Sequence, residues 1–211
     1  MKKQDLPDFS GGGSLIWAND LAGVLNTDFE NNIATRTNGT CINTMQGKLI
    51  LSKSNFINNV NNTGGAGAVA FNPSATYITE CKFEENKASG TIGGALYGKT
   101  LYYGVVGDGT KIENSQFIKN KAKVEGGAIF LDDIRYNLGA KKLLIKDCEF
   151  NENSAEDKGG AIATNHIKES VYGGGYTYGE AVPGEIRIEN CKFNKNIARK
   201  NGMPKWLKRL K

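Results

Sequence analysis

Apolar side chains recur along this chain in short alternating runs, and one run returns six times. Each copy has an aliphatic residue, a small residue three positions later, phenylalanine two positions after that, and asparagine three positions further on. No stretch before the last few residues shows a sustained 3.6-residue apolar stripe, so the pattern predicts strands rather than helices. The six Phe-x-x-Asn motifs are Phe29–Asn32, Phe56–Asn59, Phe83–Asn86, Phe117–Asn120, Phe150–Asn153 and Phe193–Asn196.

Other residue types also recur at fixed distances from this motif in each copy. Alanine follows the asparagine by two positions in every copy except the second, where Asn61 stands. Eight to ten residues after each phenylalanine comes a glycine, usually in a pair: Gly39, Gly64-Gly65, Gly93-Gly94, Gly126-Gly127, Gly159-Gly160 and Gly202. Self-similarity at a period of 27 to 43 residues indicates a solenoid or array.

Stacked coils explain these columns physically. In a parallel β-helix each coil lies about 4.8 Å from the next, so every column becomes a ladder of like side chains. Phenylalanines then form a core, asparagines form an amide ladder at a turn, and Gly-Gly permits a corner with positive φ. Parallel crossovers are almost always right-handed. We therefore predict an all-β, right-handed parallel β-helix of about six to seven coils with lateral loop insertions.

Charged residues follow the same columns with alternating sign. Two such columns are Glu85, Lys119, Glu152 and Lys195, and Glu113, Lys146 and Glu189. We expect solvated pairs between neighbouring coils, each contributing about 0.2–1 kcal/mol. These carboxylates are therefore poor candidates for catalysis.

The net charge of +5 is concentrated at one end of the chain. Residues 199–211 carry six basic residues and no acid, so a basic face along the solenoid that would bind nucleic acid is not expected. We divide the chain into a lead-in (1–10), one repeat domain (11–202) and a basic tail (203–211). The tail either caps the open end of the core or contacts a membrane surface or nucleic acid.

The four cysteines do not have the spacing of a metal site, since no Cys-x-x-Cys occurs. Cys81, Cys148 and Cys191 share the small-residue column with serines and a threonine, so we interpret them as core fillers. Cys148 and Cys191 fall in consecutive coils, but neighbouring parallel strands orient their Cβ atoms poorly for a bridge. We expect free thiols, no metal and no cofactor.

The combination of Phe-x-x-Asn with Gly93-Gly94-Ala95-Leu96, Gly126-Gly127-Ala128-Ile129 and Gly159-Gly160-Ala161-Ile162 resembles the repeat of bacterial polymorphic outer-membrane proteins. It is also similar to related adhesin-like β-helix proteins of microbes and protists. The resemblance covers about residues 11 to 202. It implies a passenger displayed on a cell surface or outside the cell, often adhesive.

No run of 18 apolar residues occurs, so no transmembrane segment is expected. Residues 1–7 have charge but no apolar core, so no secretory signal is visible. Either the protein is cytosolic, or this is a fragment or incomplete gene model of a longer surface protein; we favour the second interpretation.

Coil length varies only between the glycines and the next small residue. Extra residues enter there in three successive coils, at 98–109, 132–141 and 164–183, and we expect them on one lateral face. Six of the eight tyrosines lie in these insertions: Tyr102, Tyr103, Tyr136, Tyr172, Tyr176 and Tyr178. They either pack the loops onto the solenoid or form a patch that binds sugar rings or protein surfaces.

Two classes of function remain open. The first is a non-catalytic surface or adhesion module that binds a glycan or cell-surface protein through the tyrosines. The second is a carbohydrate-active lyase or hydrolase, for which Asp132, Asp133, Arg135 and His166 are the candidate residues. A hydrolase needs two carboxylates about 5–5.5 or 6.5–9.5 Å apart. Consecutive strand residues such as Asp132 and Asp133 point to opposite faces, so we favour the binding module.

Overall fold

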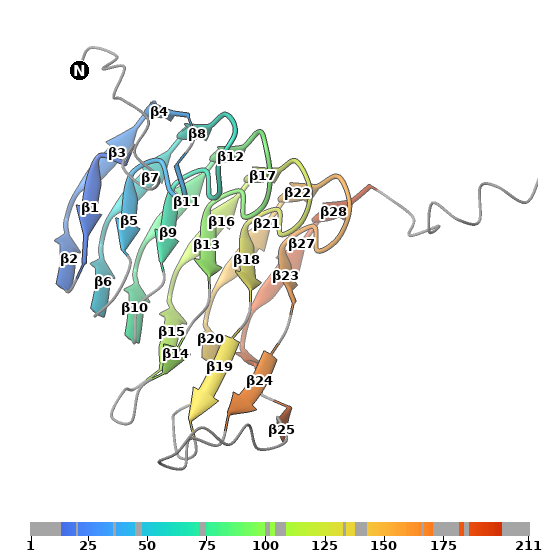
Figure 1. Cartoon of the computed structure of the whole chain (residues 1–211). Coiled ribbons are helices and arrows are strands. Elements are labelled where there is room, and N and C mark those ends of the chain that lie inside the picture. Colours follow the sequence, from blue (N-terminus) through green and yellow to red (C-terminus); the bar gives the residue numbers. More distant parts are fainter. Residues whose placement is uncertain are drawn as a thin grey trace, which may run out of the picture.

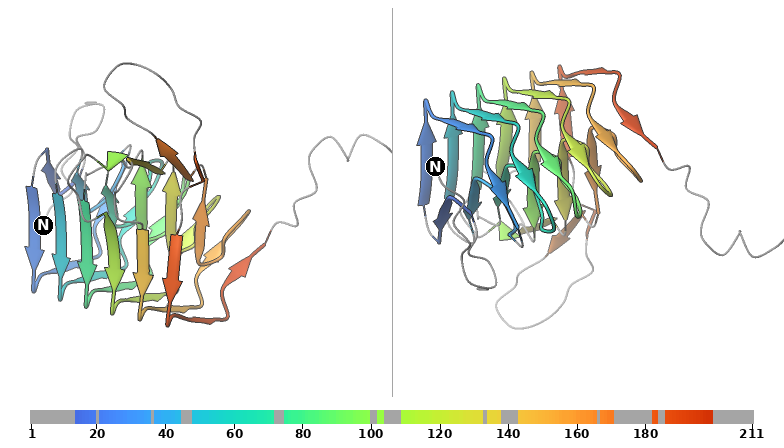
Figure 2. Two further views of the ribbon diagram at one scale, coloured as in Figure 1. Left: turned by 90° about the horizontal axis from the view of Figure 1, so that it is seen from below. Right: turned by 90° about the horizontal axis from the view of Figure 1, so that it is seen from above.

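The computed structural model describes residues 14–19, 21–35, 37–44, 48–71, 75–99, 102–103, 109–132, 134–137, 143–165, 167–170, 182–183 and 186–199. The predicted lead-in (1–10) and basic tail (203–211) lie outside these ranges. Within them the chain is all-β and winds into a right-handed parallel β-helix of six coils, which confirms the predicted fold class. Figures 1 and 2 show the coils stacked one behind another in chain order.

Each coil contributes one strand to each of four parallel six-stranded sheets. Sheet 1 contains β1 (Ile16–Ala18), β5 (Ile42–Thr44), β9 (Val69–Phe71), β13 (Leu96–Lys99), β18 (Ile129–Asp132) and β23 (Ile162–Thr164). Sheet 2 contains β2 (Leu21–Leu25), β6 (Lys48–Ser52), β10 (Ala75–Thr79), β15 (Thr110–Glu113), β20 (Leu143–Lys146) and β26 (Ile186–Glu189).

The recurring Phe-x-x-Asn motif begins in the third sheet and ends at the turn into the fourth. Sheet 3 contains β3 (Asp28–Glu30), β7 (Asn55–Ile57), β11 (Lys82–Glu84), β16 (Gln116–Ile118), β21 (Glu149–Asn151) and β27 (Lys192–Asn194). Sheet 4 contains β4 (Ile33–Ala34), β8 (Val60–Asn61), β12 (Lys87–Ala88), β17 (Lys121–Ala122), β22 (Ser154–Ala155) and β28 (Ile197–Ala198).

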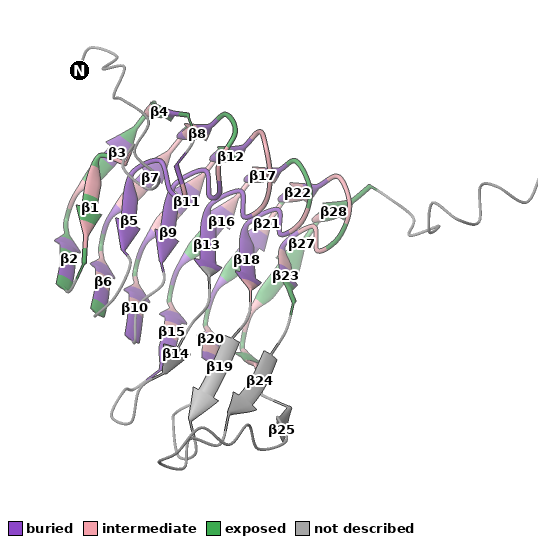
Figure 3. Ribbon diagram, in the orientation of Figure 1, coloured by how far each residue is buried: buried purple, intermediate pink, exposed green. Residues whose placement is uncertain are grey.

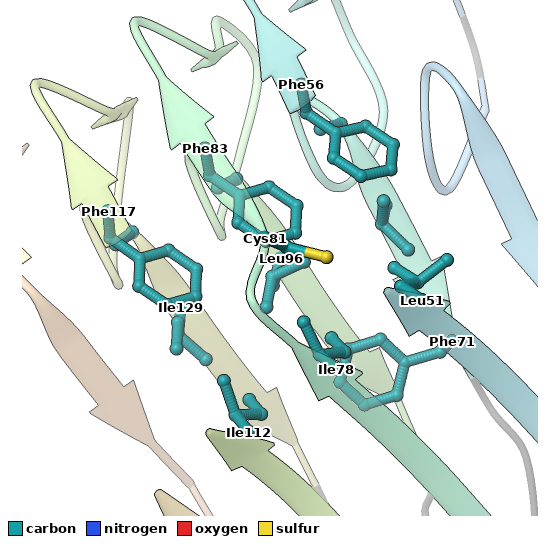
Figure 4. Close-up of a cluster of buried hydrophobic side chains, with 14 of the residues drawn as sticks. Leu51, Phe56, Phe71, Ile78, Cys81, Phe83, Leu96, Ile112, Phe117 and Ile129 are labelled. Carbon is teal, nitrogen blue, oxygen red and sulfur yellow. The ribbon is translucent and has the colours of Figure 1, made fainter. Parts of the chain in front are cut away.

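The phenylalanines form one continuous stack through the core. Ring centroids of successive coils are 4.8–5.0 Å apart and the rings are within 5° of parallel, from Phe29 to Phe193. Aliphatic residues of sheets 1 and 2, such as Ile78, Leu96 and Ile112, pack against this stack (Figure 4). In Figure 3 the residues coloured as buried run through the stacked coils, except for β26, β27 and β28 of the last coil, which contain none. The predicted phenylalanine column is therefore confirmed.

The asparagine column forms the predicted amide ladder at the turn between sheets 3 and 4. Asn86 is typical: its Nδ2 donates to Oδ1 of Asn120 at 3.0 Å and to the carbonyl oxygen of Phe56 at 2.8 Å. Its Oδ1 accepts bonds from the side-chain and backbone nitrogens of Asn59. Burying this side-chain amide is tolerated because its nitrogen donates two hydrogen bonds and its oxygen accepts two.

The small-residue column is explained by one recurring hydrogen bond. The side chain of Ser115 donates to the carbonyl oxygen of Glu113, two residues earlier, at 2.8 Å. The same hydrogen bond to the carbonyl oxygen two residues earlier is donated by Thr27, Ser54, Cys81, Cys148 and Cys191. Serine, threonine and cysteine are interchangeable here because each is small and carries a donor. All four cysteines are free thiols, so no Cys148–Cys191 disulfide forms in this structure.

Each coil has two sharp turns with positive φ at non-glycine residues, and these turns were not anticipated from the sequence. Among the described residues, twelve non-glycine residues have φ between 49° and 57°. Six precede the small residue, and the other six precede the ladder asparagine: Asn26, Lys53, Glu80, Asn114, Asp147 and Asn190, then Asn31, Asn58, Glu85, Lys119, Glu152 and Lys195. The glycine corner was predicted, and Gly93, Gly126 and Gly159 have φ of 59–68°.

Charged side chains pair between coils on the outer surface. Lys119 Nζ lies 3.9 Å from Glu85, within one of the predicted columns. Shorter pairs join Lys192 to Glu149 at 3.1 Å and Lys123 to Glu156 at 2.9 Å. Their exposure limits each pair to a small contribution.

Candidate functional site

The insertions of three successive coils meet in one small lateral sheet. β14 (Tyr102–Tyr103), β19 (Ile134–Asn137) and β24 (Ile167–Ser170) pair in parallel, and β25 (Val182–Pro183) pairs antiparallel to β24. Each of the first three strands follows a sheet 1 strand and precedes a sheet 2 strand. Figure 2 shows these strands to one side of the stacked coils. Because the coils are in register, extra residues at one phase of the repeat emerge side by side.

Three of the six candidate tyrosines belong to this lateral sheet. The register pairs Tyr102 with Arg135 and Tyr103 with Tyr136, and Tyr136 in turn pairs with Glu169. The backbone thus brings Tyr102, Tyr103 and Tyr136 together. Tyr172, Tyr176 and Tyr178 lie outside the described residues.

The candidate catalytic residues are only partly described. Asp132 ends β18, and its Oδ1 accepts a hydrogen bond from Asn165 Nδ2 at 3.3 Å. Arg135 lies on β19, whereas Asp133 and His166 lie outside the described residues. The described part of the chain contains no group of three His, Cys, Asp or Glu residues placed to hold a metal ion.

A second apolar cluster, which the sequence did not reveal, supports the glycine loops. Tyr97 and Phe130 pair across β13 and β18 with ring centroids 5.9 Å apart, and they pack with Ala66, Ala70 and Ala163. A Cβ on Gly65 would come within 2.7 Å of the Tyr97 ring, so the loop lies directly on it. Burial, together with the negative charge of Asp132, raises the pKa of Tyr97 to about 12.

Tyr77 is the other tyrosine outside the insertions. Lys48 Nζ lies 4.7 Å from its ring centroid and Lys111 Nζ lies 5.7 Å from it, from the coils on either side. Both distances fit cation–π contacts. This partly exposed aromatic side chain therefore ties three neighbouring coils together, a role that residue type alone did not indicate.

Comparison with protein families gives a match at two repeats. The Chlamydia polymorphic membrane protein repeat matches residues 114–132 and 147–165. Two repeats of this chain are therefore similar to the polymorphic membrane protein repeat. Each matched segment begins at a positive-φ corner, Asn114 or Asp147, and contains one Phe-x-x-Asn and one Gly-Gly-Ala-Ile motif. None of the curated proteins and none of the solved structures compared with the chain matches it.

Each matched segment thus corresponds to one physical unit of the solenoid. It starts at the corner after sheet 2, crosses sheets 3 and 4, and ends at or just beyond the sheet 1 strand. The lateral strand β14 lies before the first matched segment, β19 lies between the two, and β24 lies after the second. Over the described ranges, the structure contains no helix of the length and apolarity needed to cross a membrane.

Proposed function

We propose that this chain is a surface-exposed, adhesin-like repeat module that binds a glycan or a cell-surface protein through its tyrosine-rich insertions. The observation that carries the proposal is the parallel pairing of β14, β19 and β24, which gathers three insertions at one side of the solenoid. The polymorphic membrane protein repeats support a surface location by analogy with that family.

The chemistry of the insertions suits recognition. Tyrosine offers a flat apolar ring for stacking on a sugar or protein surface and a hydroxyl that donates and accepts hydrogen bonds. Binding residues are often found on loops positioned by a rigid scaffold, and the ladders of the solenoid provide one here. The ligand face comprises Tyr102, Tyr103, Tyr136, Tyr172, Tyr176 and Tyr178.

A triple variant tests the proposal. Changing Tyr136, Tyr172 and Tyr176 together to Ala should abolish most binding to a glycan array or to cultured cells while the melting temperature stays nearly unchanged. Tyr77→Ala is the matched control, because it removes a tyrosine from sheet 2 and should leave binding intact. A triple variant that loses stability would instead mean that these tyrosines pack the loops.

An activity assay on the unmodified protein distinguishes a binding module from an enzyme. We expect no turnover of pectin-like or other uronic polysaccharides. Turnover that disappears in Asp132→Asn or Asp133→Asn would assign the protein to carbohydrate-active enzymes and overturn the binding proposal.

A further inference from the structure

One pair of charged residues on sheet 4 departs from the pattern of the other sheets. Lys87 of β12 and Lys121 of β17 are partners in register, so two positive charges lie on adjacent strands. The other charged partners in the described strands of the four six-stranded sheets have opposite signs: Lys99 with Asp132, Glu113 with Lys146, Lys146 with Glu189, and Glu149 with Lys192. Like charges that face each other across strands destabilise a sheet. An anion bound between these two lysines would remove that repulsion.

Both lysines are available to a ligand. The next residues, Ala88 and Ala122, are buried, so strand alternation turns the lysines to the outer surface. Lys87 is exposed and Lys121 is partly buried. Their strands are about 4.8 Å apart, as in any sheet. Within the described ranges, neither ammonium group has a hydrogen bond or an ion pair.

A hydroxyl group continues the same column in the next coil. Ser154 of β22 is the register partner of Lys121 on the side away from Lys87. Its side chain is partly buried, and its hydroxyl has no hydrogen bond to any residue that the structure describes. Three successive coils thus present two ammonium groups and one hydroxyl group, all able to donate. A sulfate or phosphate ester has three terminal oxygens that accept from such a set, whereas a carboxylate has two.

The charges around this column limit the size of the ligand. Lys119 and Lys123 lie on either side of Lys121 in the same coil, and each is already paired, with Glu85 at 3.9 Å and with Glu156 at 2.9 Å. A long polyanion such as duplex nucleic acid would meet these carboxylates as well as the lysines. The free positive charge therefore suits a single anionic group.

The surroundings of the column favour a sugar as the carrier of that group. Asn62 and Ser89, which follow the neighbouring strands β8 and β12, are polar and uncharged, so they can bond to sugar hydroxyl groups. The sheet 4 strands contain no aromatic residue, so ring stacking does not contribute to recognition there. Charge and hydrogen bonding would carry the affinity.

We propose that Lys87, Lys121 and Ser154 form an anion site, the sheet 4 lysine site, that binds the ester group of a sulfated or phosphorylated sugar. The ester oxygens accept hydrogen bonds from both ammonium groups and from the Ser154 hydroxyl. In Figure 1, sheet 4 lies on the opposite side of the solenoid from β19 and β24. The inference is therefore independent of the proposed tyrosine face.

Calorimetric titration of the full chain with glucose 6-sulfate and with glucose 6-phosphate tests the site. We expect both esters to bind and unmodified glucose not to bind, with affinities that fall as sodium chloride is added. Lys87→Gln and Lys121→Gln should each weaken ester binding about tenfold. Lys146→Gln is the matched control: it removes the same charge from sheet 2, where both register partners are acids, and should leave ester binding unchanged.

Thermal unfolding gives a second measurement. Without ligand, Lys87→Gln should melt no lower than the native chain, because the change removes a repulsion and no ion pair. Weaker binding by this variant could then not be attributed to unfolding. Glucose 6-sulfate should raise the melting temperature of the native chain, and it should have little effect on the variant with both lysines changed to Gln.

Four results would overturn the assignment. Equal ester affinity in the native chain and in the double variant would place the bound ester elsewhere. Glucuronate binding as tightly as the esters would show that a carboxylate suffices. O-phosphoserine binding more tightly than glucose 6-phosphate would point to a phosphorylated protein instead of a sugar. A lower melting temperature for Lys87→Gln without ligand would show that this lysine stabilises the sheet.

Discussion

Asn86 donates its side-chain amide to Asn120, 34 residues later in the chain, across a distance of 3.0 Å. Both side chains are completely buried, and each is held at the same corner of its coil. The bond is one step of a ladder that runs from Asn32 to Asn196. Neighbouring coils are thus joined by a buried, directional contact in addition to their strand pairing.

Replacing Asn120 by Ala should destabilise the protein by at least about 1–3 kcal/mol. The change leaves the amide and backbone nitrogens of Asn86 without their acceptor in a buried site. Chemical denaturation measures the loss. Asn196→Ala is the control: it lies in the last coil, where water can replace the lost bonds, so a similar cost at both positions would contradict the role of burial.

Replacing Phe117 by Ala should cost about 3–5 kcal/mol, as for other buried aromatic residues. Its ring is fully buried and stacks on Phe83 and Phe150 at 5.0 and 4.9 Å. Thermal or urea unfolding of the variant gives the value. Phe193→Ala, which removes a half-exposed ring with one neighbour, should cost clearly less; the opposite order would argue against a continuous core.

Gly127→Ala should destabilise the protein by about 1–3 kcal/mol or more, because the new methyl group would collide with the carbonyl oxygen of Gly160 in the next coil. Gly23→Ala provides a matched comparison. Its Cβ would meet nothing closer than Leu25 Cδ1 at 4.0 Å, so stability should stay the same or rise slightly. Differential scanning calorimetry of the two variants distinguishes the close approach from a general effect of glycine loss.

Cys148→Ser should be tolerated at neutral pH, since Ser54 and Ser115 make the equivalent hydrogen bond in the same column. Burial raises the pKa of the Cys148 thiol from 9.0 to about 12. Folding therefore favours the neutral thiol, and this contribution is complete below pH 9 and is lost as the pH rises towards 12.

The alkaline limb of the stability profile tests that titration. Unfolding free energies measured between pH 8 and 11 should fall less steeply in Cys148→Ser than in the native chain. Thiol counting gives an independent measurement: four groups should react after unfolding, and Cys148 should react slowly before it. A Cys148–Cys191 bridge in protein isolated from its native source would contradict the packing role of the column.

Sequence reasoning found the elements whose side chains repeat. Residues that recur at fixed positions within each repeat stack on one another in a parallel solenoid. The sequence could therefore place Phe117, Asn120 and Ser115 in their columns. The corners at Glu85 and Lys119 escaped it, because neither residue type favours positive φ and the conformation is imposed by the turn between sheets. The cluster of Tyr97 with Phe130 was also missed, since it depends on a loop folding back over sheet 1.

For the candidate site as well, the sequence predicted one part of the arrangement and not another. The insertion strands could be placed together from the sequence because they enter at one phase of the repeat, and the pairing of Tyr103 with Tyr136 agrees with that placement. The directions of the tyrosine side chains do not follow from periodicity, because the insertions themselves share no repeated motif. Ligand binding by these residues therefore stays a prediction.

In this solenoid, the number of residues in a coil does not determine how far that coil extends along the solenoid axis. Phe56 and Phe83 are 27 residues apart in sequence and Phe150 and Phe193 are 43 apart, yet both pairs of rings are separated by 4.8 Å. A coil that gains a long insertion widens the solenoid without lengthening it. The length of the solenoid along its axis therefore changes only when a whole coil is duplicated or deleted. Insertions at the side of a coil leave that length unchanged.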